Sequence, residues 1–336
     1  MHDKTVRTIE DIAQIAGVSK STVSRALNDS PLIGEDTKKR IHAIAKEHNF
    51  EICIPARRLS MQETRTIAFV TQVWHYDFSI SALFSMEMLS AIDVALAANH
   101  YDLLMTQVNP YDTAWINQYL NTKRVDGFIL MTSTRKPFHI SALVESDAPF
   151  IVWGVPKPGM NYCSVMGDNY TGGLIGTRHL VKSGRKRIAF IGGPTDEMEV
   201  QRRFDGYKAA LKEGGLEFDP ERVVYANFTY EAGAAAVQQL LSQAPDLDAV
   251  FVCGDVMAVA VLDALQRAGR RVPGDVAVVG YDDLSIAAIS QPPLTTVRQN
   301  IPMSGRMLAE GLINYLKNRI VTNVTIPVEL VVRESA

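Results

Sequence analysis

The stretch that most constrains this chain is TIEDIAQIAGVSKSTVSRALN, which runs from residue 8 to residue 28. It predicts two short helices joined by a tight turn, because apolar residues recur at three- and four-residue spacing on either side of Gly17. Thr8 and Asp11 have the spacing of a capping box at the first helix. Gly17 suits the left-handed backbone that ends many helices, and Ser19 is a favoured N-cap for the next one. The pattern is typical of a helix-turn-helix.

The second helix, Lys20–Leu27, is the part that such a unit presents to DNA. Its first turn points into the major groove, and Val23, Ala26 and Leu27 face inward. The alternative is an ordinary helical hairpin, but a turn-rich loop and a third helix at Glu35–Asn49 complete a headpiece of DNA-binding size. The predicted DNA contacts in the headpiece are Thr8, Ser19, Lys20, Ser21, Thr22, Ser24, Arg25 and Asn28.

The same run, followed by TKKRI, resembles the N-terminal signature of the LacI/GalR family of bacterial transcription regulators. The resemblance implies a regulator, expected to be a repressor, that binds a pseudo-palindromic double-stranded operator as a homodimer. It also implies a small-molecule effector, expected to be a sugar or sugar derivative. A purine or a phosphoprotein corepressor stays open as the signal, and a sugar-binding transport protein is a further alternative.

Residues 50–65 are predicted to be a hinge between the headpiece, 1–49, and the rest of the chain. In the family that the chain resembles, a hinge helix inserts a leucine into the minor groove, and Ala56-Arg57-Arg58-Leu59 matches the family pattern. Ala56 and Leu59 are therefore added to the predicted DNA contacts. A solvated linker is the alternative, and Ile52-Cys53 replaces the usual Pro-Asn, which leaves the start of the helix open.

Length, charge and cysteine usage set broader limits. A chain of 336 residues is long enough for two or three domains. The formal charge is -3, but residues 1–60 hold ten basic and eight acidic side chains, which fits a small DNA-facing module on an acidic body. The N-terminus has no signal-peptide core, and no apolar run approaches a membrane span, so a cytoplasmic protein is expected. The three scattered cysteines are predicted to be reduced thiols.

From residue 66 onward, short apolar runs alternate with helix-length amphipathic ones. This alternation predicts an α/β fold of parallel sheets with helices on both faces. The pattern restarts near residue 161, which suggests two sheets, and it resembles the periplasmic-binding-protein-like core of the same family, with two Rossmann-like lobes. We expect an N-lobe of about 66–160 plus 293–322 and a C-lobe of about 161–292 plus 323–336.

The loops after the strands of such sheets bind ligands, and these loops carry the candidate effector residues. An aromatic cluster, Trp74, Tyr76 and Phe78, follows the first strand and suits the CH-rich faces of a sugar, although packing against a neighbouring helix or a dimer mate is the alternative. The resemblance adds four further positions, for which an interlobe salt bridge or core packing is the alternative role: Asp168, Arg203, Phe228 and Asp282.

One departure from the family pattern falls inside this site. Gly254 occupies the place of an asparagine that contacts the effector in relatives, and Asp255 is predicted to cap the following helix. No nucleophile, zinc-ligand or P-loop motif occurs, and the glycine cluster at 172–176 lacks the dinucleotide-loop spacing. The sequence therefore predicts a protein that is not an enzyme, with no cofactor and no metal.

Overall fold

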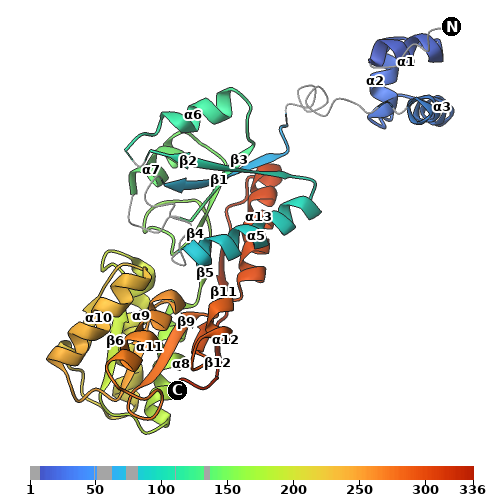
Figure 1. The fold of residues 1–336 in the computed structure, drawn as a ribbon. Helices are drawn as coiled ribbons and strands as arrows, with labels where there is room; N and C mark the ends of the chain where they lie inside the picture. Colours follow the sequence, from blue (N-terminus) through green and yellow to red (C-terminus); the bar gives the residue numbers. More distant parts are fainter. Residues whose placement is uncertain (1–7, 49, 51–62, 73–81, 110, 132–136) are drawn as a thin grey trace. The chain divides into compact units, whose positions relative to one another are not determined.

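The structure is a computed structural model that describes residues 8–48, 50, 63–72, 82–109, 111–131 and 137–336 (Figure 1). It divides into two compact units, Met1–Thr64 and Arg65–Ala336. In the described residues, the regular secondary structure of the first unit is helical, and the second unit contains two six-stranded sheets. The predicted hinge helix, with Ala56 and Leu59, lies outside the described residues.

The headpiece consists of α1 (Ile9–Ala16), α2 (Lys20–Leu27) and α3 (Glu35–Glu47). The Thr8–Asp11 capping box is present in both directions, and Gly17 ends α1 with a φ of 63°. The core is formed by apolar side chains from all three helices, including the fully buried Ile12, Val23 and Ile41. The predicted two-helix unit with a third supporting helix is confirmed.

The N-lobe is built on an all-parallel sheet in the order β11-β5-β4-β3-β1-β2. Successive residues of its strand β1 enter opposite clusters, because Ile67 and Phe69 pack with one layer of helices while Ala68 and Val70 pack with the other. The strands are β1 (Thr66–Gln72), β2 (Asp102–Val108), β3 (Gly127–Leu130), β4 (Phe150–Trp153), β5 (Cys163–Gly167) and β11 (Asn323–Ile326). The helices are α5 (Leu83–Ala98), α6 (Ala114–Asn121), α7 (Pro137–Glu145) and α13 (Ile301–Asn318).

The C-lobe sheet has the order β12-β10-β9-β8-β6-β7, and only its β10–β12 pairing is antiparallel. Its strands are β6 (Ile188–Gly192), β7 (Val223–Tyr225), β8 (Ala249–Val252), β9 (Ala277–Asp282), β10 (Thr295–Arg298) and β12 (Glu329–Val331). Its helices are α8 (Asn169–Lys182), α9 (Met198–Glu213), η2 (Pro220–Arg222), α10 (Tyr230–Gln243), α11 (Asp255–Arg267) and α12 (Ser285–Ile289). Among the described residues, no helix is both long and apolar enough to cross a bilayer.

The chain changes lobe after β5, after β10 and after β11, and these places differ from the expected lobe boundaries. Residues 163–167 were expected in the C-lobe but pair with β4 in the N-lobe, and residues 295–298 were expected in the N-lobe but pair with β9. Residues 323–326 were also expected in the C-lobe but pair with β5 in the N-lobe, while β12 joins the C-lobe sheet. An apolar run indicates a buried strand, but it does not indicate which of two similar sheets the strand joins.

Candidate DNA-binding and effector sites

The N-terminus of α2 carries a cluster of hydroxyl groups. The Ser19 Oγ accepts a hydrogen bond of 3.1 Å from the Thr22 N–H and lies 2.8 Å from the hydroxyl oxygens of both Ser21 and Thr22. Ser19 and Ser21 are exposed, as are Lys20 and Arg25. Since a helix N-terminus carries partial positive charge, this end of α2 is suited to phosphate and base-edge contacts.

Other predicted DNA contacts have roles inside the headpiece. The Lys20 ammonium lies 2.6 Å from a carboxylate oxygen of Glu10 in α1, with both side chains exposed. The Asn28 amide donates to the Ser24 carbonyl oxygen over 2.8 Å, which ends α2. The Thr8 hydroxyl is used in the capping box. The DNA contacts of these residues remain predictions.

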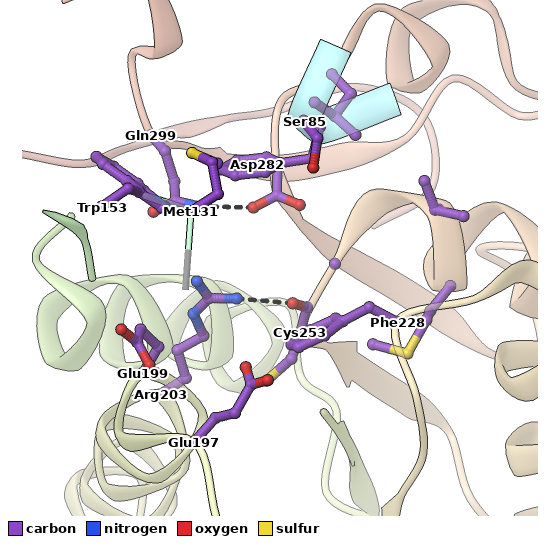
Figure 2. Close-up of a pocket in the computed structure, with 15 residues that line it drawn as sticks. Ser85, Met131, Trp153, Glu197, Glu199, Arg203, Phe228, Cys253, Asp282 and Gln299 are labelled. Carbon is purple, nitrogen blue, oxygen red and sulfur yellow. Dashed lines mark hydrogen bonds between the residues drawn. The ribbon is translucent and has the colours of Figure 1, made fainter. Parts of the chain in front are cut away.

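A cavity of about 240 Å³ lies between the N-lobe and the C-lobe (Figure 2). It opens where strands of both sheets end, as expected for a ligand site on parallel sheets. Its lining mixes aromatic, charged and apolar side chains: Phe84, Ser85, Met131, Trp153, Glu197, Glu199, Arg203, Phe228, Cys253, Gly254, Val256, Met257, Asp282, Leu284 and Gln299. Three of the seven predicted effector residues, Arg203, Phe228 and Asp282, are brought together here.

Arg203 is held in one orientation by contacts on several sides. Its Nε donates to the Asn169 Oδ1 over 2.8 Å, and its Nη1 donates to the Cys253 carbonyl oxygen over 2.7 Å, the latter drawn in Figure 2. The guanidinium carbon lies 3.7 Å from the centroid of the Tyr281 ring. Neither of these two hydrogen bonds uses Nη2. The contacts hold the guanidinium in one orientation, in which Nη2 can donate to a ligand oxygen.

Asp282 accepts a hydrogen bond of 2.6 Å from the Gln299 side-chain amide and occupies the left-handed region with a φ of 119°. Burial raises the pKa of Asp282 to about 7, against the opposing effect of the Arg203 charge. The carboxyl group therefore changes its charge near neutral pH, where a ligand hydroxyl that donates to it favours the ionised form.

Asp255 does not cap α11, contrary to the prediction. It is the first residue of the helix and is fully buried, and its two oxygens accept from the Leu284 N–H over 2.8 Å and the Thr296 hydroxyl over 2.6 Å. Burial raises the pKa of Asp255 well above its usual range. The carboxyl group does not cap its own helix, because the Leu284 N–H and the Thr296 hydroxyl, which belong to other parts of the chain, donate to it instead. Asp255 is not among the residues that line the cavity.

Gly254 opens space in the cavity. A Cβ at this position would lie 3.4 Å from the Phe228 ring and 3.7 Å from the Asp282 Oδ2. The departure from the family asparagine therefore removes an amide from the site and leaves room between an aromatic face and a carboxyl group.

Asp168, in contrast, is not among the cavity-lining residues. Its carboxylate caps α8 by accepting from the Thr171 N–H over 3.1 Å and the Thr171 hydroxyl over 2.7 Å. Its effector contact stays a prediction. Trp74, Tyr76 and Phe78 lie outside the described residues.

Several lining residues were not predicted from the sequence. Met131 and Trp153 directly follow or end N-lobe strands, so the strand-end rule that selected the aromatic cluster could have selected them too. Gln299 follows β10, which was not recognised as a strand. Glu197 is the N-cap of α9 and Glu199 lies in its first turn; neither carries a distinguishing signal in the sequence, because acidic residues are common at helix N-termini.

Comparisons with known proteins agree with this architecture. A model of the lacI family of bacterial regulatory proteins matches residues 8–51, and a periplasmic binding protein-like domain model matches residues 177–336. The HTH-type transcriptional regulator CelR of Thermobifida fusca is 36% identical over 329 residues, covering 96% of this chain and 95% of the relative. The ribose operon repressor of Escherichia coli (strain K12) is 33% identical over 318 residues, covering 91% and 92%.

Solved structures show the same fold. A CelR–cellobiose complex superposes with a TM-score of 0.75 at 33% identity, covering 98% of this chain and 99% of the other. The lac repressor dimer bound to operator and the anti-inducer ONPF has a TM-score of 0.82 at 24% identity, covering 99% of each, and supports the fold alone. These relatives are transcription regulators, which confirms the prediction that the protein is not an enzyme. The chain belongs to the lacI family of bacterial regulatory proteins.

Proposed function

We propose that this protein is a homodimeric, cytoplasmic repressor that binds a pseudo-palindromic operator and responds to a saccharide in the interlobe cavity. The observation that carries the proposal is the grouping of Arg203, Asp282 and Phe228 around one cavity in a chain that also has a lacI-type headpiece. Two headpieces would occupy two half-sites, with Lys20 and Arg25 at base edges and the hydroxyl cluster at phosphates.

The chemistry of the lining favours a small sugar. Phe228 and Trp153 offer aromatic faces for CH groups, Arg203 offers donors, and Asp282 offers acceptors for hydroxyl groups. The cavity volume of about 240 Å³ lies below the roughly 300–1,000 Å³ of drug-sized ligand pockets, which favours a ligand as small as a monosaccharide. CelR was solved with cellobiose, and another relative is named for a ribose operon, so the relatives support this ligand class.

A purine is the second candidate effector. The HTH-type transcriptional repressor PurR of Haemophilus influenzae (strain PittEE) is 30% identical over 338 residues and covers 98% of each chain. Gly254 places no side chain against the Phe228 ring, on which a flat base could stack. A phosphoprotein corepressor would instead bind outside the cavity. The transport-protein alternative is disfavoured by the lacI-type headpiece.

Thermal unfolding of the full-length protein with a panel of ligands tests the proposal. A ligand that binds only the folded state stabilises it by about 2.7 kcal/mol at one hundred times its Kd. We expect a rise in Tm with at least one neutral mono- or disaccharide, and altered binding to an operator selected from a random DNA pool in the presence of that sugar. A rise with purines alone would support the second candidate, and no rise with any small molecule would contradict the cavity as the effector site.

A further inference from the structure

Glu199 joins the two lobes at the edge of the cavity. It lies in the first turn of α9 in the C-lobe, and its Oε1 accepts a hydrogen bond of 2.7 Å from the Val155 N–H, which follows β4 in the N-lobe. A second carboxylate bridge runs in the opposite direction, because Glu87 of α5 accepts from the Ser285 N–H over 3.0 Å and from the Ser285 hydroxyl over 2.7 Å. Of these two residues, Glu199 lines the cavity, and Glu87 is not among the described residues that line it.

The other carboxylate oxygen of Glu199 lacks a donor. Its Oε2 is buried and has no hydrogen-bond partner within the part of the chain that the structure describes. Figure 2 shows Glu199 and Arg203 extending from the same helix into the lined space. A buried acceptor without a partner costs free energy, and a donor supplied by the occupant of the cavity would remove that cost.

We propose that Glu199 determines specificity in the effector site, with Oε2 accepting a hydrogen bond from a hydroxyl group of a neutral saccharide while Oε1 keeps its bond to Val155. The inference rests on the proposed function, since it assigns an acceptor for a hydroxyl of that effector. A sugar phosphate that placed its phosphate here would bring a second negative charge against the carboxylate and would be rejected.

The position of Glu199 also gives the effector a route to the angle between the lobes. One carboxylate group serves both partners, so a ligand hydroxyl on Oε2 restricts the side chain that holds the Val155 bridge. A ligand that stabilises the interlobe bond is in turn stabilised by that bond to the same extent, because linkage makes the coupling reciprocal.

Isothermal titration calorimetry on the full-length protein tests this assignment, with cellobiose, glucose and ribose as probes. The variant Glu199→Gln keeps a carbonyl oxygen for the Val155 N–H but replaces the other acceptor by an amide donor. We expect the Kd of a bound sugar to rise by about 10- to 100-fold, the loss associated with one hydrogen bond to a charged group. Glu213→Gln is the matched control, because Glu213 lies on the same helix in an exposed pair with Arg178, and its Kd should stay within about twofold of wild type.

Monodeoxy analogues of the bound sugar separate a ligand contact from a general structural effect. One analogue should bind wild type more weakly than the parent sugar but bind Glu199→Gln as well as the parent does. A normal Kd for Glu199→Gln, or an equal loss for every analogue, would overturn the assignment and leave the saccharide effector standing. If wild type binds none of the probes or a wider panel of neutral sugars, the proposed function fails, and the role of Glu199 fails with it.

Discussion

The Arg203 guanidinium lies over the Tyr281 ring, with 3.7 Å between the guanidinium carbon and the ring centroid. Tyr281 is fully buried at the end of β9, next to Asp282, so one strand end supplies both the surface that supports the arginine and the carboxyl group that faces the cavity. The ring holds Arg203 by a cation–π contact, while hydrogen bonds to Asn169 and Cys253 fix its fork.

Tyr281→Phe should keep effector binding and should not lower stability. The Tyr281 hydroxyl is buried and has no hydrogen-bond partner among the described residues, so its removal relieves an unmet polar group while the ring remains. We expect the free energy of unfolding to stay equal or rise by about 1 kcal/mol in urea denaturation. Tyr281→Leu removes the ring and should weaken effector binding; equal behaviour of the two variants would contradict the cation–π role.

Effector affinity should rise with pH across neutrality. Burial raises the pKa of Asp282 to about 7, and the ionisable groups that act on it include Arg203, which lowers it, and Glu87 and Asp255. A ligand that binds the ionised carboxylate should bind about tenfold more tightly at pH 8 than at pH 6. Calorimetric titrations at several pH values measure this, and Asp282→Asn should bind weakly with a flat profile.

The same carboxyl group should influence the stability of the ligand-free protein in the opposite sense. Its folded pKa exceeds the unfolded value of about 3.9, so its stabilising contribution is full below that value and is lost as the pH rises through about 7. The free energy of unfolding of Asp282→Asn should therefore rise relative to that of wild type as the pH increases from about 5 to about 8. An unchanged difference across this range would show that Asp282 is already ionised.

Gly173→Ala should disrupt the contact between α8 and α9. A Cβ at Gly173 would lie 2.0 Å from the Arg203 carbonyl oxygen, so the backbone of α9 must shift and carry Arg203 with it. We expect a loss of about 1–3 kcal/mol in the free energy of unfolding and weaker effector binding. Gly274→Ala is the control, because its nearest neighbour would be the Arg271 Cβ at 3.4 Å, an ordinary contact.

Glu10→Gln should strengthen DNA binding at low salt. The substitution frees Lys20 of α2 from an ion pair in which both side chains are exposed, so stability should change by less than about 1 kcal/mol. One additional phosphate contact would steepen the dependence of log affinity on log salt by about 0.9. Fluorescence anisotropy with labelled duplex DNA measures this. Glu47→Gln adds the same charge in α3, and an equal gain there would exclude a specific effect of Lys20.

Local signals predicted most of the fold. The bounds of α2 agree with the predicted Lys20–Leu27, because a capping residue and a glycine turn are properties of the residues themselves. The lobe boundaries near 163–167 and 295–298 were wrong because sheet membership depends on distant partners. The predicted capping role of Asp255 was wrong for the same reason, because the Leu284 N–H and the Thr296 hydroxyl reach its carboxyl group only in the folded chain.

The candidate site was predictable to the extent that a family motif or a strand end marked it. Arg203, Asp282 and Phe228 stood in motifs and do line the cavity. Glu199 was not predicted, because a helix pattern does not reveal which acidic residue of the first turn faces another lobe. The bond to Val155 and the buried Oε2 exist only in the tertiary structure.

The most direct test of the account is a titration of the protein–operator complex with the sugar that raises the Tm most. The fluorescence anisotropy of the labelled operator reports how much protein stays bound. We predict that the sugar changes operator affinity by about 5- to 150-fold, the range of ordinary allosteric coupling, and that Asp282→Asn loses this response while still binding the operator. An operator affinity that is the same with and without the bound sugar would contradict the account.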